Sequence, residues 1–211
     1  MSVTVNNPIR GRFQSWFLAS LDSIFHRIYG QRKIALTHNM PGTIVEIGPG
    51  TGANFRYYPA GTNVIAIEPN VQMYDRLTRK AEEHNINLEI RGLKGESIDL
   101  DDGSVDFVAS TLVLCSVDDP AQVVSEIKRI LKPGGQYMFI EHVAAPTGTW
   151  LRKLQSAVKP PWKYTFEGCC PDRESWIVIE NAGFHSVSLE HFDMQSPFIH
   201  IRPHIAGIAT K

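Results

Sequence analysis

The sequence predicts an α/β protein with one doubly wound, mostly parallel sheet of seven strands that ends in an antiparallel hairpin. Three observations favour this fold. A β-branched run, Thr43–Ile47, leads directly into three glycines at alternate positions, Gly48, Gly50 and Gly52. Strand-like and helix-like segments then alternate along the chain, which is typical of a parallel sheet. The 211 residues are enough for one domain with a sizeable core, so we expect residues 1–211 to form a single domain.

Composition excludes several classes of protein. The net charge of −1 gives no general attraction to nucleic acid. Three cysteines, two of them adjacent, do not make a disulfide framework and favour a reducing compartment. There is no apolar run of the roughly 18 residues that span a bilayer, and no secretory signal pattern at the N-terminus. We therefore expect a cytoplasmic protein, and nothing in the sequence indicates a protein partner.

The N-terminal segment predicts a covering helix. Residues 1–9 are polar and expected to be frayed. From Gly11 to Lys33, apolar residues recur at helical steps, with Arg and Lys near both ends. The first interpretation is a helix over the core and the ligand site. The second is that residues 11–33 also contact a membrane surface peripherally, because aromatic residues flanked by basic ones suit that interface. Tyr29 either reaches a cofactor from this helix or packs as an ordinary aromatic.

The glycine loop fits two ligand-binding patterns. Gly48, Gly50 and Ala53 match the dinucleotide spacing, whereas Gly48, Gly50 and Gly52 match that of methyl transfer. Pro59 limits any following helix to one or two turns, and a dinucleotide site needs a long helix facing its pyrophosphate. S-adenosylmethionine has no phosphate and needs close backbone approach instead. We therefore prefer it over a dinucleotide, and both over a simple tight turn.

An acidic residue marks the second strand, Asn63–Glu68. Glu68 lies 20 residues after Gly48, where a carboxylate accepts the two ribose hydroxyls of an adenosine group. A helix over Asn70–Asn85 follows, and its expected inner face holds Val71, Tyr74, Leu77 and Ala81. Asn87–Arg91 is the third strand.

The other cofactor candidates lie at the carboxyl ends of strands, where open α/β sheets bind ligands. The loop Gly95-Glu96-Ser97 is expected over the adenine, with Glu96 and Ser97 at the base edge, or else solvated. Thr111 and Leu112 follow the fourth strand, Val105–Ser110, and are expected to line the cofactor. Cys115 is expected to be a small buried filler. The remaining candidates flank these positions: Glu46, Pro49, Asn54 and Pro69.

The second half of the chain supplies the expected acceptor side. A helix opening at Asp119-Pro120 precedes the fifth strand, Gln136–Glu141, which brings His142 to the same edge as Gly48. His142 either accepts a proton or positions the acceptor there, or makes a structural hydrogen bond. Residues 143–171 form an aromatic-rich insertion that predicts an acceptor pocket, or else an ordinary cover. Cys169-Cys170 lacks the spacing of a zinc or redox pair, so no metal site is expected.

The C-terminal region predicts one more helix and the hairpin. Asp172 is expected to cap a helix that runs to Ala182 and stops at Gly183. Ser186–Phe192 and Ile199–Thr210 are the two strands of the hairpin. Its loop carries Asp193, Ser196 and Pro197.

The strand, glycine loop, Glu68 and closing hairpin together resemble the class I S-adenosylmethionine-dependent methyltransferases, which have a Rossmann-like sheet. More specific stretches resemble the methyltransferase-like family of alkyl thiol S-methyltransferases: Gly52–Phe55 with Tyr58-Pro59, Thr111–Val117, Glu141–Ala144, Gly168–Cys170 with Arg173–Trp176, and Arg202–Gly207. The resemblance covers nearly the whole chain. It implies methyl transfer to the sulfur of a small thiol or sulfide.

The sequence departs from that family at three places. The family carries a hydrophobic N-terminal anchor, and only the amphipathic segment 11–33 stands in that place here. Its Leu-Thr after the cysteine is Pro171-Asp172, which leaves the pocket shape open. Its acid at the end of the second strand is usually Asp, and Glu68 should serve the ribose equally well.

The expected chemistry is the in-line attack of a thiolate on a methyl group, for which positioning supplies most of the rate. His142 is the first candidate to take the thiol's proton and His204 the second. One alternative is an O-, N- or C-methyltransferase acting on a lipophilic metabolite of the quinone or lipid type. The other is an inactive module that only binds the cofactor or a partner.

Overall fold

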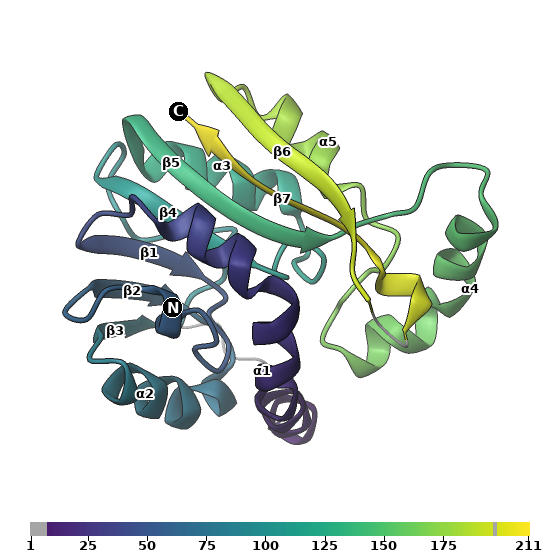
Figure 1. The fold of residues 1–211 in the computed structure, drawn as a ribbon, viewed down its shortest axis with the longest axis horizontal. Helices are drawn as coiled ribbons and strands as arrows, with labels where there is room; N and C mark the ends of the chain where they lie inside the picture. The colour runs from purple at the N-terminus through teal and green to yellow at the C-terminus, as the bar shows by residue number, and fades with distance from the viewer. Residues whose placement is uncertain (1–7, 196–197) are drawn as a thin grey trace.

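The computed structural model describes residues 8–195 and 198–211. Its centre is one seven-stranded sheet in the order β3-β2-β1-β4-β5-β7-β6 (Figure 1). The first five strands pair in parallel, and β7 pairs antiparallel with both β5 and β6. This confirms the predicted fold. The strands are β1 (Thr43–Ile47), β2 (Asn63–Ile67), β3 (Asn87–Arg91), β4 (Val105–Thr111), β5 (Leu131–His142), β6 (Ser186–Asp193) and β7 (Pro203–Thr210).

Helices cover both faces of the sheet, which is why β1 is buried along all but its first residue. In Figure 1, α1 crosses in front of the sheet, and α3 and α5 lie behind β5, β6 and β7. Each layer has its own apolar core, one containing Tyr29 and Leu77, the other containing Val124 and Ile179. The helices are α1 (Pro8–Thr37), α2 (Tyr74–Glu83), α3 (Pro120–Ile130), α4 (Trp150–Thr165) and α5 (Ser175–Asn181), with short 3₁₀ turns at Phe55–Tyr57, Val71–Met73 and Ile199–Ile201.

The first helix is longer than the 11–33 expected. It already begins at Pro8, so the prediction of fraying is wrong for residues 8–9, and for 1–7 it lies outside the described residues. None of the helices among the described residues is both long and apolar enough to cross a membrane.

Asn70 explains why α2 starts later than expected. Its side chain accepts a hydrogen bond from the Gln72 amide and caps a 3₁₀ turn, and α2 proper begins only at Tyr74. Val71 was expected on the inner face of this helix. That prediction is wrong, because the turn leaves Val71 40% exposed.

Residues 143–171 contain a helix, α4, which continues through Pro160 and Pro161. This helix displaces two expected features. Lys159 holds Asp172 in an ion pair at 3.0 Å, so Asp172 is not a cap and α5 starts at Ser175. Gln155 donates hydrogen bonds to the carbonyls of Val143 and His200. The second strand of the hairpin therefore does not begin at Ile199 as expected: the segment at 199–201 is a 3₁₀ turn, and β7 starts at Pro203.

The hairpin loop can be compared with its prediction only in part. Asp193 is the last residue of β6 rather than a loop residue. Ser196 and Pro197 lie outside the described residues.

Candidate active site

The carboxyl ends of β1, β4 and β5 open into one cavity with about 1000 Å³ of empty space, part of it continuous with solvent. The glycine loop forms one wall. Other walls come from α1, α4, the turn after β4, the end of β5 and the loop after α4. Among the predicted site residues, the cavity is lined by Tyr29, Glu46, Gly48, Pro49, Gly50, Asn54, Thr111, Leu112 and His142. One cavity thus joins the expected cofactor side to the expected acceptor side.

The glycine loop is built for close backbone approach. Gly48, Gly50 and Gly52 all have positive φ angles, of 59°, 57° and 83°. A Cβ atom on Gly48 would lie 2.7 Å from a methyl carbon of Val113, and one on Gly52 would lie 2.9 Å from Lys80. Only glycine fits these two positions without displacing a neighbour.

Glu46 places a buried carboxylate at the wall of this cavity. It accepts hydrogen bonds from Asn54 Nδ2 at 2.7 Å and from the Tyr58 hydroxyl at 2.9 Å. Burial raises the pKa of Glu46 to about 7, although both hydrogen bonds oppose the rise. Asn54 also donates to Thr111 Oγ1 at 3.2 Å, and its own Oδ1 is buried without a partner in the described part of the chain. Glu46 and Asn54 together can therefore accept further hydrogen bonds, for example from an ammonium group.

Lys33 is a cavity residue that the sequence did not identify. It reaches the cavity from α1, is 3% exposed, and its ammonium lies 5.4 Å from the centre of the Tyr57 ring. Within the described residues its ammonium has no hydrogen-bonded or ion-paired partner, while its carbonyl accepts the Thr37 hydroxyl at 2.7 Å. Burial lowers its pKa to about 8. Lys33 falls four residues after Tyr29, on the same inward face, and that spacing was the available signal.

Glu68 is held beside the glycine loop. Its carboxylate accepts the Gly50 amide at 3.0 Å and the Asn70 amide at 2.9 Å. Burial raises its pKa to about 7, against the effect of these two hydrogen bonds. Glu68 does not line the cavity. Gly11 of α1 packs against the Asn70 side chain. The Asn70 amide also donates to Glu167 at 3.2 Å. Helix α1 and the C-terminal part of the 143–171 insertion therefore cover the chain next to Glu68.

The remaining cofactor candidates lie outside the cavity wall. Glu96 accepts hydrogen bonds from the amides of Asp118 and Asp119, just before α3, and Ser97 is exposed. Gly95 packs against Ile47. Pro69 is half-buried next to Glu68. Gly52 lies behind the loop, against Phe55. Their roles toward a cofactor stay predictions.

The turn after β4 is strained and anchored. Leu112 has a φ of 59°, a region that only a few per cent of non-glycine residues occupy, often at functional sites. Glu141 stabilises the turn, because its Oε1 accepts the Val113 and Leu114 amides at 2.9 and 3.0 Å. Sequence analysis assigned Glu141 no role beyond membership of a family motif. Here it fixes one wall of the cavity.

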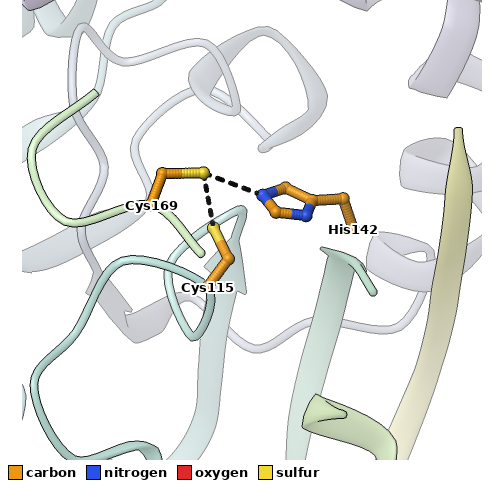
Figure 2. A group of neighbouring side chains, drawn as sticks. All are labelled: Cys115, His142 and Cys169. Carbon is orange, nitrogen blue, oxygen red and sulfur yellow. Dashed lines mark hydrogen bonds between the residues drawn. The ribbon is translucent and has the colours of Figure 1, made fainter. Parts of the chain in front are cut away.

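Three buried side chains meet at the expected acceptor end of the cavity. Figure 2 shows the His142 ring and the Cys115 side chain both pointing to Cys169. His142 Nε2 lies 3.0 Å from Cys169 Sγ, and the two sulfurs are 3.9 Å apart. The Trp162 indole donates to Cys169 Sγ at 3.2 Å. Cys115 is thus buried as expected, but it belongs to a cluster rather than acting only as a filler.

His204 does not fit the role of proton acceptor that the sequence suggested. Its Nε2 pairs with the Tyr29 hydroxyl at 2.8 Å, and its Nδ1 lies 2.9 Å from the Arg202 carbonyl. Burial lowers its pKa to about 3, so the ring is neutral, and it does not line the cavity. The geometry favours a different role, in which His204 holds Tyr29 in the cavity wall.

Aromatic side chains enclose the expected acceptor end. Phe17 of α1 packs on Phe166 with ring centres 5.2 Å apart, and Phe166 lies 4.1 Å from Trp162 of α4. All three line the cavity. The N-terminal helix and the insertion therefore both border the cavity. That the insertion forms the acceptor side stays a prediction.

Sequence comparison relates the chain to known methyltransferases. A family model described as a methyltransferase domain matches residues 45–139. The chain is 42% identical over 171 residues to the human thiol S-methyltransferase TMT1B, covering 80% of this chain and 70% of that protein. It is 36% identical over 208 residues to human thiol S-methyltransferase TMT1A, covering 93% and 85%.

Solved structures show the same fold at low sequence identity. A methyltransferase from Thermotoga maritima, described as a possible histamine N-methyltransferase, superimposes with a TM-score of 0.63 at 20% identity and covers 93% of this chain and 97% of its own. Geranyl diphosphate C-methyltransferase from Streptomyces coelicolor, solved with S-adenosyl-L-homocysteine, gives 0.66 at 18% identity, covering 88% and 80%.

Proposed function

Because this chain belongs to the methyltransferase family of the thiol S-methyltransferases TMT1A and TMT1B, we propose that it transfers a methyl group from S-adenosylmethionine to the sulfur of a small thiol. One observation carries the proposal: a single cavity is lined both by the glycine loop and by a sheltered aromatic end that contains Cys115, His142 and Cys169. A donor and a small acceptor can therefore meet inside it.

The residues of the cavity suit S-adenosylmethionine, which supplies a methyl group on a positively charged sulfur. The glycine loop offers backbone without side chains. Glu46, with the free Oδ1 of Asn54, can accept hydrogen bonds from an ammonium group. Lys33 can bind a carboxylate, so the two charges match the ends of an amino acid. Glu68 can still accept ribose hydroxyls, since each carboxylate oxygen has two lone pairs and only one is used.

The acceptor end suits a small apolar thiol. Phe17, Trp162 and Phe166 supply an apolar enclosure, and enclosure raises the rate chiefly by holding the sulfur in line with the methyl group. His142 lies at this end and positions the acceptor. A free thiol has a pKa of about 8.5, so a useful fraction ionises near neutral pH.

We expect a thiol to be methylated and its alcohol analogue not to be. A matched pair with the same carbon skeleton should be assayed with the full chain between about pH 6 and 9, and the thiol rate should rise toward the thiol's own pKa. A phenol and phosphatidylethanolamine serve as tests of the alternative acceptors. Methylation of the alcohol, phenol or amine at a rate equal to that of the thiol would reject sulfur as the acceptor atom.

We also propose that α1 contacts a membrane surface from the cytoplasmic side. Three of its large apolar residues face outward, with Trp16 57%, Ile24 47% and Ile34 59% exposed. Basic residues lie near them on the helix, a pattern that suits an anionic interface. The three cysteines are free thiols, which suits the cytoplasmic side.

Anionic phosphatidylserine vesicles should therefore bind the protein, and Trp16→Ser with Ile24→Ser should weaken that binding at least about 10-fold, on the scale of the apolar area withdrawn. Ile177→Ser is the matched control, because Ile177 is 41% exposed on α5. Co-sedimentation that is equal for wild type and the double variant would show that α1 does not contact the bilayer.

A further inference from the structure

Cys115, His142 and Cys169 form a set of metal-ligand type, and the methyl-transfer proposal gives no role to the two cysteines. Their Sγ, Nε2 and Sγ atoms all lie within 4.8 Å of one another, and all three residues are buried (Figure 2). They come from three separate places: the turn after β4, the end of β5, and the loop after α4. The fold, rather than local sequence, brings these ligand atoms together.

We propose that Cys115, His142 and Cys169 bind one thiophilic divalent cation, with zinc as the best match, and that its fourth coordination position faces the cavity. The second half of this statement rests on the proposed function, because the ligand we assign to the fourth position is the sulfur of the acceptor thiol.

The distances fit tetrahedral coordination. Zinc binds sulfur at about 2.3 Å and imidazole nitrogen at about 2.0–2.1 Å, so a tetrahedral ion separates two sulfurs by about 3.8 Å and sulfur from nitrogen by about 3.6 Å. The two sulfurs here are 3.9 Å apart. His142 Nε2 and Cys169 Sγ are 3.0 Å apart and would need to separate by about 0.6 Å. The third pair, His142 Nε2 and Cys115 Sγ, lies within 4.8 Å.

The charges also balance. Two thiolates and a neutral imidazole around Zn²⁺ give a net charge of zero, which a buried position tolerates far better than an uncompensated ion. Binding through Nε2 puts the ring proton of His142 on Nδ1. The Trp162 indole N–H donates to Cys169 Sγ at 3.2 Å, the kind of outer contact that orients a thiolate ligand.

The ligand count favours a site that takes a substrate. Structural zinc sites use four protein ligands, whereas catalytic ones use three and leave one position open. Cys170 does not supply a fourth ligand, because its sulfur contacts the Gly168 carbonyl and Arg173 instead. Cys115, His142 and Cys169 all line the cavity, so the open position is reached from the same space as the glycine loop.

A thiol bound at that position would lose its proton more readily, because a cation stabilises the thiolate. The proton leaves to water. The bond between the acceptor sulfur and the methyl carbon then forms as the donor's sulfonium–methyl bond breaks, and the electron pair of that bond stays on the donor sulfur. The product is a neutral thioether, a weaker ligand than a thiolate, so it can leave the metal.

The test uses the full chain, purified without a histidine tag and kept reduced. Metal content is measured after zinc loading, and Co²⁺ is then titrated as a spectroscopic substitute. We expect one ion per chain, with the absorption of tetrahedral cobalt bound to two thiolates. Cys115→Ser and Cys169→Ser should weaken Co²⁺ binding at least about 100-fold. Cys170→Ser, a buried cysteine outside the set, should bind as wild type does, and circular dichroism checks that every variant is folded.

A second measurement tests the open position. The small aliphatic thiol should change the cobalt spectrum, and its alcohol analogue should not. Several results would overturn the inference: less than stoichiometric metal in the reduced protein, binding to Cys115→Ser and Cys169→Ser equal to that of Cys170→Ser, or a cobalt spectrum that the thiol leaves unchanged. If the protein is instead isolated with a Cys115–Cys169 disulfide and binds no metal after that disulfide is reduced, the inference is also overturned.

Activity separates this inference from the proposed function. Thiol methylation at the full rate by chelator-stripped protein would overturn the role of the ion and leave the thiol methyltransferase standing. Stoichiometric metal with the expected spectral response, but no thiol methylation, would support the metal site and reject the proposed function.

Discussion

Gly48→Ala is expected to weaken S-adenosylmethionine binding at least about 100-fold and to lower the free energy of unfolding by about 2–3 kcal/mol. Gly48 has a φ of 59°, where an L-residue costs about 1–2 kcal/mol. The added Cβ would also lie 2.7 Å from Val113 Cγ2. Val113 cannot retreat freely, because Glu141 binds its amide at 2.9 Å. The loop must therefore move, and it is the loop that approaches the cofactor.

The control for this change is Gly61→Ala. Gly61 also has a positive φ, of 86°, but nothing lies within 4 Å of an added Cβ. Gly61→Ala should lower the free energy of unfolding only by the cost of the positive φ, about 1–2 kcal/mol, and leave the cofactor affinity unchanged. Isothermal calorimetry and urea unfolding measure the two quantities. Equal cofactor affinity in Gly48→Ala, Gly61→Ala and wild type would show that the loop does not contact the cofactor.

The second large effect is expected from Glu68→Ala, which should weaken S-adenosylmethionine binding by about 1–3 kcal/mol, or roughly 5- to 160-fold. The change removes the carboxylate that we expect to accept the ribose hydroxyls at the edge of the glycine loop, beside the cavity rather than in its wall. It also removes the acceptor for the amides of Gly50 and Asn70, which shapes the loop. Glu89→Ala is the control, because Glu89 is exposed on the neighbouring strand β3 and pairs with Arg91 at 2.7 Å.

The pKa of Glu68 gives this prediction a pH signature. Burial raises that pKa to about 7 in the free protein, and hydroxyl donors favour the ionised form. Binding should therefore release a proton, and affinity should fall as pH drops below about 7. Calorimetry in buffers of different ionisation enthalpy counts the proton. Unchanged affinity in Glu68→Ala would place the ribose elsewhere.

The sequence predicted best those features that are local. Strand β1, the glycine loop and Glu68 form a continuous signal, in which a buried apolar run, residues with positive φ and an acid follow one another at fixed spacing. The elements that failed depend on distant contacts. Helix α4 was not predicted, because two adjacent prolines, Pro160 and Pro161, disfavour a helix. The segment Ile199–Arg202 was predicted as strand, and a hydrogen bond from Gln155 of α4 to the His200 carbonyl holds it in a different conformation.

The residues of the candidate site that could be predicted are those at the carboxyl ends of the strands. His142 could be placed because it ends the strand beside β4, whose end approaches the glycine loop. Its cluster with Cys115 and Cys169 could not, because 27 residues separate His142 from each cysteine and no known ligand spacing relates them. Lys33 was missed for a similar reason. It was counted among the charges at the helix end, and only the packing of α1 shows that it is buried.

The transfer of a methyl group to sulfur is tested most directly with S-adenosylmethionine that carries a trideuterated methyl group. The purified protein is incubated with it and a small aliphatic thiol, and the products are identified by mass spectrometry. The expected result is a trideuteromethyl thioether formed in step with S-adenosylhomocysteine, and lost in Gly48→Ala. Formation of S-adenosylhomocysteine without the labelled thioether, or label on an oxygen or nitrogen acceptor but not on the thiol, would contradict it.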